Sequence, residues 1–222
     1  MNKQLITIGV IILAVCLAGK LLWTGLKNIK VDEFHPASVI FIVDSSASNQ
    51  KSLPNQIKFL KSLCSLLDPE DQIKILKTSQ NAYLIYEGSP MDTAGISKAV
   101  DAFTKLEDKD YGTAYGEAMK KAVSHSLNMY KENYTPAIVV IGDLENEGAI
   151  EKQINWDVLP DNIAKAKENM PELTMMFVYA HPEKLDMVKE KLNPVLGEHH
   201  LIVATEQMAS KISTKFLNAI GR

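Results

Sequence analysis

The sequence predicts a doubly wound α/β fold with a mainly parallel, Rossmann-like sheet, one antiparallel edge strand and a hydrophobic helix at the N-terminus. Three observations lead to this prediction. Apolar runs of strand length alternate with stretches of helical spacing along residues 38–220, two neighbouring strand patterns suggest a hairpin, and residues 5–26 contain a single charged side chain. Alternating strands and helices are typical of a parallel sheet that helices cover on both faces.

The strands are predicted from short runs of β-branched and aromatic residues. Residues 38–43 contain five consecutive apolar side chains, as expected for a strand that is buried on both faces. Residues 72–79 and 81–88 alternate apolar and polar side chains and follow each other closely, so they are expected to pair as a hairpin that supplies the antiparallel edge strand. Further strands are expected at residues 136–143, 173–180 and 199–205.

The helices are predicted from apolar residues at spacings of three and four. In residues 53–67 such side chains recur at Ile57, Leu60, Leu63 and Leu67. Further helices are expected at residues 93–106, 113–132, 156–169, 182–192 and 205–219. In a fold of this class the working site lies at the carboxyl ends of the strands.

The N-terminal segment is predicted to be a membrane anchor. Residues 5–19 are uncharged and apolar, and the apolar character continues to Leu26 around Lys20, whose long side chain can reach the lipid head groups. A cleaved signal peptide and a lipid-modified Cys16 are alternatives, but neither has a well-matched processing site. The expected organisation is a transmembrane signal anchor at residues 1–27, a linker at 28–37 and a globular domain at 38–222.

The predicted anchor makes the chain a single-pass membrane protein, and two signals disagree about its sidedness. Lys20, Lys27 and Lys30 follow the start of the apolar segment, which favours a cytoplasmic domain under the positive-inside rule. The very short charged tail before the apolar run is instead typical of exported signal anchors. We expect an extracytoplasmic domain.

The charge of the chain argues against nucleic-acid binding. The formal net charge is −3, from 24 basic and 27 acidic residues. Four of the basic residues and none of the acidic ones lie in residues 1–30, so the remainder has 20 basic against 27 acidic residues, a net charge of −7. An acidic domain does not neutralise nucleic-acid phosphates, but it is compatible with cation binding.

Polar side chains cluster where two predicted strands end and one predicted helix begins. Asp44, Ser46 and Ser48 follow the first strand with the spacing D-x-S-x-S. Thr113 lies at a helix start in YGTAYGEA, and Asp143 ends the strand PAIVVIGD. Turn and capping chemistry explains each of these residues taken singly. Because the carboxyl ends of parallel strands meet at one edge of a sheet, we expect the five side chains to converge.

This spacing resembles the metal-ion-dependent adhesion site (MIDAS) of the von Willebrand factor type A (VWA) domain family, and the order of elements over residues 38–220 is similar to that family as well. The resemblance implies a VWA-like protein-binding module that recognises an Asp or Glu side chain of a partner protein and is not an enzyme. One departure is the segment Gly142-Asp143-Leu144, where the family often has Thr-Asp-Gly. The implied ligands of Mg²⁺, or else of Mn²⁺ or Ca²⁺, are Asp44, Ser46, Ser48, Thr113 and Asp143.

The chemistry of these residue types suits such a site. Mg²⁺ prefers six oxygen ligands and releases its waters reluctantly. Serine and threonine hydroxyls can be neutral direct ligands, whereas Asp44 and Asp143 can hold coordinated waters. A metal with few direct anionic ligands remains attractive to an incoming carboxylate.

Two other functions remain open at this point. The domain can be a structural subunit of a membrane complex in which the metal is not essential. It can also be a metal-dependent phosphohydrolase that uses Asp44 or Asp143, although no general base accompanies these residues in the sequence. The sequence contains no P-loop pattern, and we expect no small-molecule substrate.

Overall fold

The computed structural model describes residues 35–101 and 112–222. The predicted anchor at residues 1–27 lies outside them, as do most of the predicted linker and the end of the helix predicted at 93–106. Within the described residues no helix is both long and apolar enough to cross a bilayer. A compact unit extends from His35 to Arg222.

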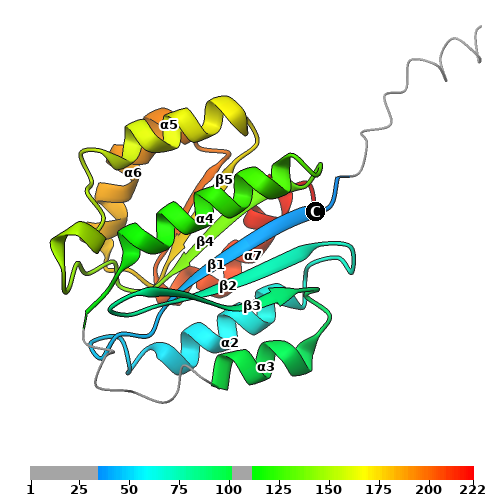
Figure 1. Cartoon of the computed structure of the whole chain (residues 1–222), viewed down its shortest axis with the longest axis horizontal. Helices are drawn as coiled ribbons and strands as arrows, with labels where there is room; N and C mark the ends of the chain where they lie inside the picture. The colour runs from blue at the N-terminus through cyan, green and yellow to red at the C-terminus, as the bar shows by residue number, and fades with distance from the viewer. Residues whose placement is uncertain (1–34, 102–111) are drawn as a thin grey trace, which may run out of the picture. The chain divides into compact units, whose positions relative to one another are not determined.

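The described strands form one sheet in the order β3-β2-β1-β4-β5-β6 (Figure 1). They are β1 (Ala37–Asp44), β2 (Gln72–Thr78), β3 (Ala82–Gly88), β4 (Thr135–Ile141), β5 (Thr174–Val178) and β6 (Leu201–Ala204). Among these strands only β3 runs antiparallel to its neighbour, and it lies at the edge of the sheet. The prediction of a mainly parallel sheet with one antiparallel edge strand is confirmed.

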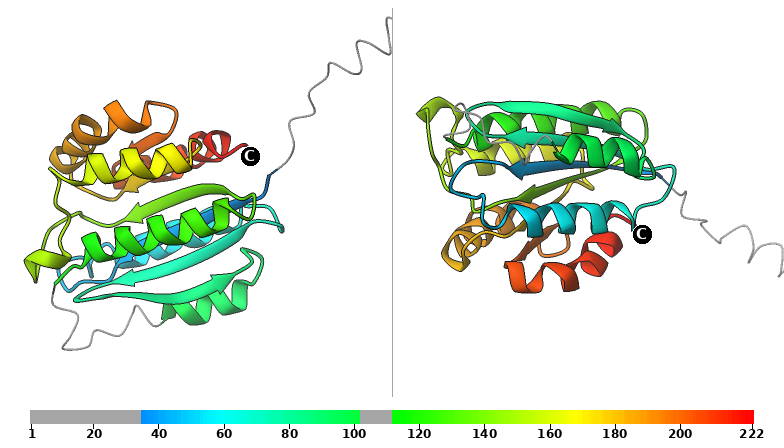
Figure 2. Two further views of the ribbon diagram at one scale, coloured as in Figure 1. Left: turned by 45° about the horizontal axis from the view of Figure 1, so that its top comes forward. Right: turned by 90° about the horizontal axis from the view of Figure 1, so that it is seen from below.

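Helices cover both faces of this sheet (Figure 2). One face packs against α2 (Leu53–Cys64), α3 (Thr93–Asp101) and α7 (Ala209–Ala219), and the other packs against α4 (Tyr115–Tyr130), α5 (Leu159–Asn169) and α6 (Pro182–Leu196). The short 3₁₀ helices η2 (Ile150–Lys152) and η3 (Glu206–Met208) precede α5 and α7. The two apolar layers confirm the doubly wound class.

Most described helix ends lie within three residues of the predicted ones, and larger differences occur at the end of α6 and the start of α7. α6 continues past residue 192 to Leu196, although Pro194 lies inside it. Proline lacks an N–H donor, and near the end of a helix that loss removes little of the hydrogen-bond ladder. Gly197, with φ of 76°, ends α6 and donates its N–H to the Asn193 carbonyl at 2.9 Å. α7 begins only at Ala209 because the residues before it form the 3₁₀ turn η3.

The central strand β1 is buried along its whole length. Val39 and Phe41 pack on the side of α2, whereas Ile40 and Ile42 pack on the side of α4. Full burial of such a side chain contributes about 1.5–3 kcal/mol relative to exposure. Because β1 pairs with β2 on one side and β4 on the other, its last residue, Asp44, is held firmly at the carboxyl edge of the sheet.

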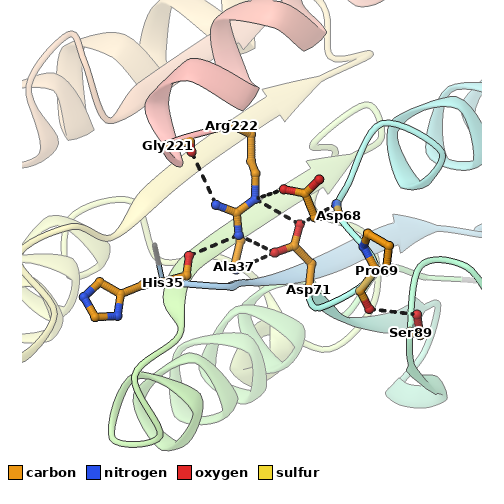
Figure 3. A network of polar contacts seen from close by, with 8 residues as sticks. All are labelled: His35, Ala37, Asp68, Pro69, Asp71, Ser89, Gly221 and Arg222. Carbon is orange, nitrogen blue, oxygen red and sulfur yellow. Dashed lines mark hydrogen bonds and ion pairs between the residues drawn. The ribbon is translucent and has the colours of Figure 1, made fainter. Parts of the chain in front are cut away.

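A buried ion pair closes the opposite, amino-terminal edge (Figure 3). Asp71 is fully buried, and its carboxylate accepts the N–H groups of Ala37 (2.6 Å) and Asp68 (2.8 Å). Arg222, the single arginine in the sequence, pairs with Asp71 and with Asp68 (3.0 Å), and it donates to the His35 carbonyl (3.1 Å). The Asp71 carboxylate therefore ties together the start of β1, the start of β2 and the residues after α7.

Replacing Arg222 by alanine should lower the free energy of unfolding by about 3 kcal/mol, because the buried carboxylate of Asp71 then loses its cation. Urea unfolding of the purified variant measures this change. Lys215→Ala, which removes an exposed charge from α7, is the matched control and should change stability by less than about 0.5 kcal/mol. Equal stability of the two variants would show that the buried pair contributes no net stabilisation.

Candidate metal centre

The side chains that follow β1 form a hydrogen-bonded group at the carboxyl edge of the sheet. Asp44 is fully buried, with Oδ1 accepting the backbone N–H of Ser46 (2.8 Å) and Oδ2 accepting the hydroxyl of Tyr115 (2.9 Å). The hydroxyl oxygens of Ser46 and Ser48 lie 3.0 Å apart. An aspartate that binds the backbone two residues further on is ordinary turn chemistry, and here it brings three of the predicted residues together.

Asn49 holds this loop against α2. Its side-chain N–H donates to the Asp44 carbonyl (2.8 Å), and its amide exchanges two hydrogen bonds with that of Gln56 (2.9 and 2.8 Å). The residue at the N-cap of α2 is Ser52. Helix capping therefore does not explain the position of Ser48.

Thr113 lies just before α4 with its hydroxyl unused. Its backbone N–H donates to the Glu147 carbonyl (2.9 Å), while the N–H of Ala114, the N-cap residue, donates to the Ser79 carbonyl (2.7 Å). The Oγ1 of Thr113 is buried and has no hydrogen-bond partner within the described residues, which also holds for the hydroxyls of Thr78 and Ser79 at the end of β2. Leaving a buried hydroxyl unpaired costs about 1–3 kcal/mol, so an unpaired Thr113 calls for a ligand rather than a capping role.

Asp143 follows β4 and interacts electrostatically with Asp44. Its Oδ1 accepts the N–H of Glu145 (2.9 Å), and the residue is partly exposed. Burial, together with the neighbouring charge of Asp143, raises the pKa of Asp44 to about 7, against the opposing hydrogen bonds from Ser46 and Tyr115. A cation beside Asp44 would favour the ionised form of this carboxylate.

The backbone of the β4 loop allows this close approach. A Cβ at Gly142 would overlap the Tyr115 hydroxyl and lie 2.5 Å from the Cβ of Asp44, so the position requires glycine. Leu144 has a left-handed φ of 62°, and its N–H donates to the Tyr115 hydroxyl (3.3 Å). Such a conformation costs a leucine about 1–2 kcal/mol, and burial of its side chain in the layer beneath α4 offsets this cost. Leu144 thus adopts the conformation that glycine usually supplies.

Two further residues contact the group, and neither belongs to the predicted set. Tyr115 is fully buried, and burial together with Asp44 and Asp143 raises its pKa well above the usual value, so its hydroxyl stays protonated and can donate to Asp44. The carboxylate of Glu147 lies 3.3 Å from the Ser48 hydroxyl. Tyr115 is two residues beyond Thr113, but nothing in the local sequence distinguishes it from a core tyrosine.

The donor set fits a hard divalent cation. The described residues contain no group of three His, Cys, Asp or Glu side chains that could hold a metal. The candidate centre instead combines the carboxylates of Asp44 and Asp143 with three hydroxyls, one of them the unpaired Thr113. Hydroxyl, carboxylate and water oxygens are the ligands that Mg²⁺ and Ca²⁺ prefer.

The described residues form a small pocket at Thr113 and a larger groove on the side of α4. A pocket of about 270 Å³ is lined by Gln80, Thr113, Glu147, Gly148, Ala149 and Lys152. A larger, mostly apolar groove of about 790 Å³ lies between α4 and α5, with Met119, Val123, Leu127, Ile154 and Leu159 in its lining. Ile150, next in sequence to the small pocket, also lines the groove and is 84% exposed.

Comparison with known families supports the fold assignment. Residues 39–146 match the family described as von Willebrand factor type A domain, and this range contains all five candidate ligands. No curated protein matches the sequence.

Several solved structures have a similar fold at low sequence identity. The fold resembles proximal thread matrix protein 1 from the mussel byssus, with a TM-score of 0.59, 12% identity, and coverage of 83% of this chain and 48% of that one. It also resembles the conserved hypothetical protein BatB from Bacteroides thetaiotaomicron, with a TM-score of 0.54, 18% identity, and coverage of 84% of this chain and 100% of that one. A von Willebrand factor type A protein from Catenulispora acidiphila has a TM-score of 0.56 and 13% identity, with coverage of 83% of this chain and 42% of that one. The chain spans about half the length of the mussel protein, another structure of which has a zinc-occupied MIDAS motif. The family match and the shared fold together support a VWA domain.

Replacing Tyr115 by phenylalanine should lower the free energy of unfolding by about 2 kcal/mol, because the buried Asp44 carboxylate loses a donor and the Leu144 N–H loses its acceptor. Urea unfolding in the presence of EDTA isolates this effect from metal binding. Tyr130→Phe at the end of α4 is the control and should change stability by less than about 0.5 kcal/mol. A Tyr115→Phe variant as stable as the control would contradict the structural role given to this hydroxyl.

Proposed function

We propose that this VWA-like domain is a protein-binding module that uses a divalent cation at a MIDAS to recognise an acidic side chain of a partner protein. The observation that carries the proposal is the buried hydroxyl of Thr113, which has no partner in residues 35–101 and 112–222, together with a loop that groups Asp44, Ser46 and Ser48. The donor chemistry favours Mg²⁺, with Mn²⁺ and Ca²⁺ as alternatives.

Each residue has a proposed role. The hydroxyls of Ser46, Ser48 and Thr113 hold the cation directly, and Asp44 and Asp143 hold it through waters. When bound, the metal supplies the positive charge that attracts the partner's carboxylate. Tyr115 orients the Asp44 carboxylate, and Gly142 keeps the end of β4 close to the end of β1.

The surroundings support a protein ligand. VWA domains are generally interaction modules without enzymatic activity, and the similar mussel protein is a matrix protein. The apolar groove between α4 and α5, with the exposed Ile150 at its side, gives a protein partner area that a small anion does not use. We further propose that residues 1–27 anchor the chain in a membrane as a single span, with the domain on the extracytoplasmic side.

Mg²⁺ at about 100 times its Kd should raise the free energy of unfolding of the full chain in detergent by about 2.7 kcal/mol. Thr113→Ala should bind Mg²⁺ at least about tenfold more weakly, so at the same Mg²⁺ concentration the gain falls to about 1.4 kcal/mol or less. In EDTA the same variant should be no less stable than the wild type, because the lost hydroxyl has no partner within the described residues.

Ser126→Ala is the matched control for this experiment, since Ser126 also has a buried, unpaired hydroxyl but lies far along α4. It should leave the Mg²⁺ affinity unchanged, as calorimetric titration measures. No Mg²⁺ or Mn²⁺ binding by the wild type would refute the proposed function. Equal Mg²⁺ affinities of Thr113→Ala and Ser126→Ala would show that the Thr113 hydroxyl does not bind the metal.

Partner recognition predicts metal-dependent retention on immobilised poly-glutamate. The domain is acidic, so it should be repelled in EDTA and retained in Mg²⁺, and it should not bind poly-glutamine in either condition. Retention is measured as the eluted fraction with and without chelator. If Mg²⁺ stabilises the fold but gives no retention, the metal has the structural role of the alternative hypothesis.

A further inference from the structure

The loop after Asp143 contains Glu145, Asn146 and Glu147, and the side chains of these residues contact different groups. Glu145 forms an ion pair with Lys184 of α6 at 3.1 Å. Asn146 binds the backbone of Ile154 with both ends of its amide (3.1 and 3.2 Å). Glu147 alone of the three is directed to the candidate centre, where its Oε2 lies 3.3 Å from the Ser48 hydroxyl.

The backbone holds Glu147 in this place. Its carbonyl accepts the N–H of Thr113 (2.9 Å), so the residue contacts two of the loops that carry candidate ligands. The next residue, Gly148, has a left-handed φ of 86°, and a Cβ on Gly112 would come within 3.3 Å of its Cα. Two glycines in close contact therefore let the segment of Glu147 pack against that of Thr113.

No neighbouring cation neutralises Glu147 in residues 35–101 and 112–222. Lys152, which lines the same small pocket, donates instead to the side chain of Asn81 (2.6 Å) and to the carbonyl of Gln80 (3.1 Å). Glu147 is only partly exposed, and Asp44 and Asp143 belong to the same group. A carboxylate held beside a candidate ligand hydroxyl, with no ion-pair partner among the described residues, is placed to contact a cation at the centre.

We propose that Glu147 is a ligand of the metal at this chain's candidate centre. Its carboxylate would occupy the position that the partner's acidic side chain must take. This inference rests on the proposed function. Glu147 strengthens cation binding in the free protein, and it must be displaced when an acidic partner binds. Isolated carboxylates such as acetate therefore compete poorly, whereas an array of carboxylates such as poly-glutamate, or a partner with further contacts, can compensate for the loss of Glu147.

The test uses the full chain in detergent, loaded with Mn²⁺, and compares Glu147→Gln with Glu145→Gln. Each variant removes one negative charge from the same loop, but Glu145 is engaged with Lys184. Glu147→Gln should weaken Mn²⁺ binding about tenfold, as the loss of a metal-directed carboxylate does. It should also raise the relaxation rate of water protons per bound Mn²⁺, because a water replaces the side chain. Glu145→Gln should stay within about twofold of the wild type in affinity and leave the relaxation rate unchanged.

Acetate is the probe for the partner's carboxylate. Calorimetric titration should show acetate binding to Mn²⁺-loaded Glu147→Gln, where it displaces a water, about tenfold more tightly than to the wild type, where it must displace Glu147. Identical behaviour of the two glutamine variants, while the wild type binds Mn²⁺, would overturn the role of Glu147 and leave the metal site intact. Weaker Mn²⁺ binding without a change in proton relaxation would also overturn it, because the effect would then be electrostatic. Absence of Mn²⁺ binding in the wild type would refute the proposed function itself.

Discussion

The fully buried carboxylate of Asp44, at the end of the central strand, requires hydrogen-bond donors from the surrounding elements, and this requirement determines much of the arrangement of the candidate centre. Asp44 cannot be solvated, so each of its oxygens needs a donor, and the chain supplies the Ser46 N–H and the Tyr115 hydroxyl. The tyrosine in turn requires α4 to begin where it does, and it leaves no room for a side chain at Gly142. The positions of β1, β4 and α4 at this edge therefore depend on one desolvated group.

The domain contains a second buried aspartate, and the contrast between the two is informative. Asp71, at the amino-terminal edge, receives the guanidinium of Arg222 as well as backbone N–H groups. Within the described residues Asp44 receives only neutral donors and has the acidic Asp143 as a neighbour. The buried carboxylate of Asp71 is thus paired with a cation of the chain itself, whereas that of Asp44 has no such cation among the described residues.

The sequence was sufficient for the features that depend on short-range patterns. Apolar runs and helical spacing predicted every described strand and α-helix in order, although not the 3₁₀ helix η2. Asp44, Thr113 and Asp143 were found because they lie at strand ends or before a helix. The roles of Tyr115 and Glu147 were not predictable, because each depends on a contact with a residue 71 or 99 positions away. The sequence also did not predict that α6 extends through Pro194 or that Leu144 has a left-handed backbone conformation. Both features depend on packing against distant elements rather than on local preference.

The parallel pairing of β1 has a mechanical consequence for the membrane anchor and the partner binding that we propose. The strand begins at Ala37 and reaches the candidate centre at Asp44, so under that proposal a partner pulling against the anchor would load the strand along its own axis. Its hydrogen bonds to β2 and β4 would then be strained in shear, all at once, rather than opened one after another. The ion pair of Arg222 with Asp71, which also holds the Ala37 N–H, sits where that force would enter the domain. Under the proposed function, force would therefore enter β1 beside the Arg222–Asp71 ion pair and leave it at the candidate metal centre.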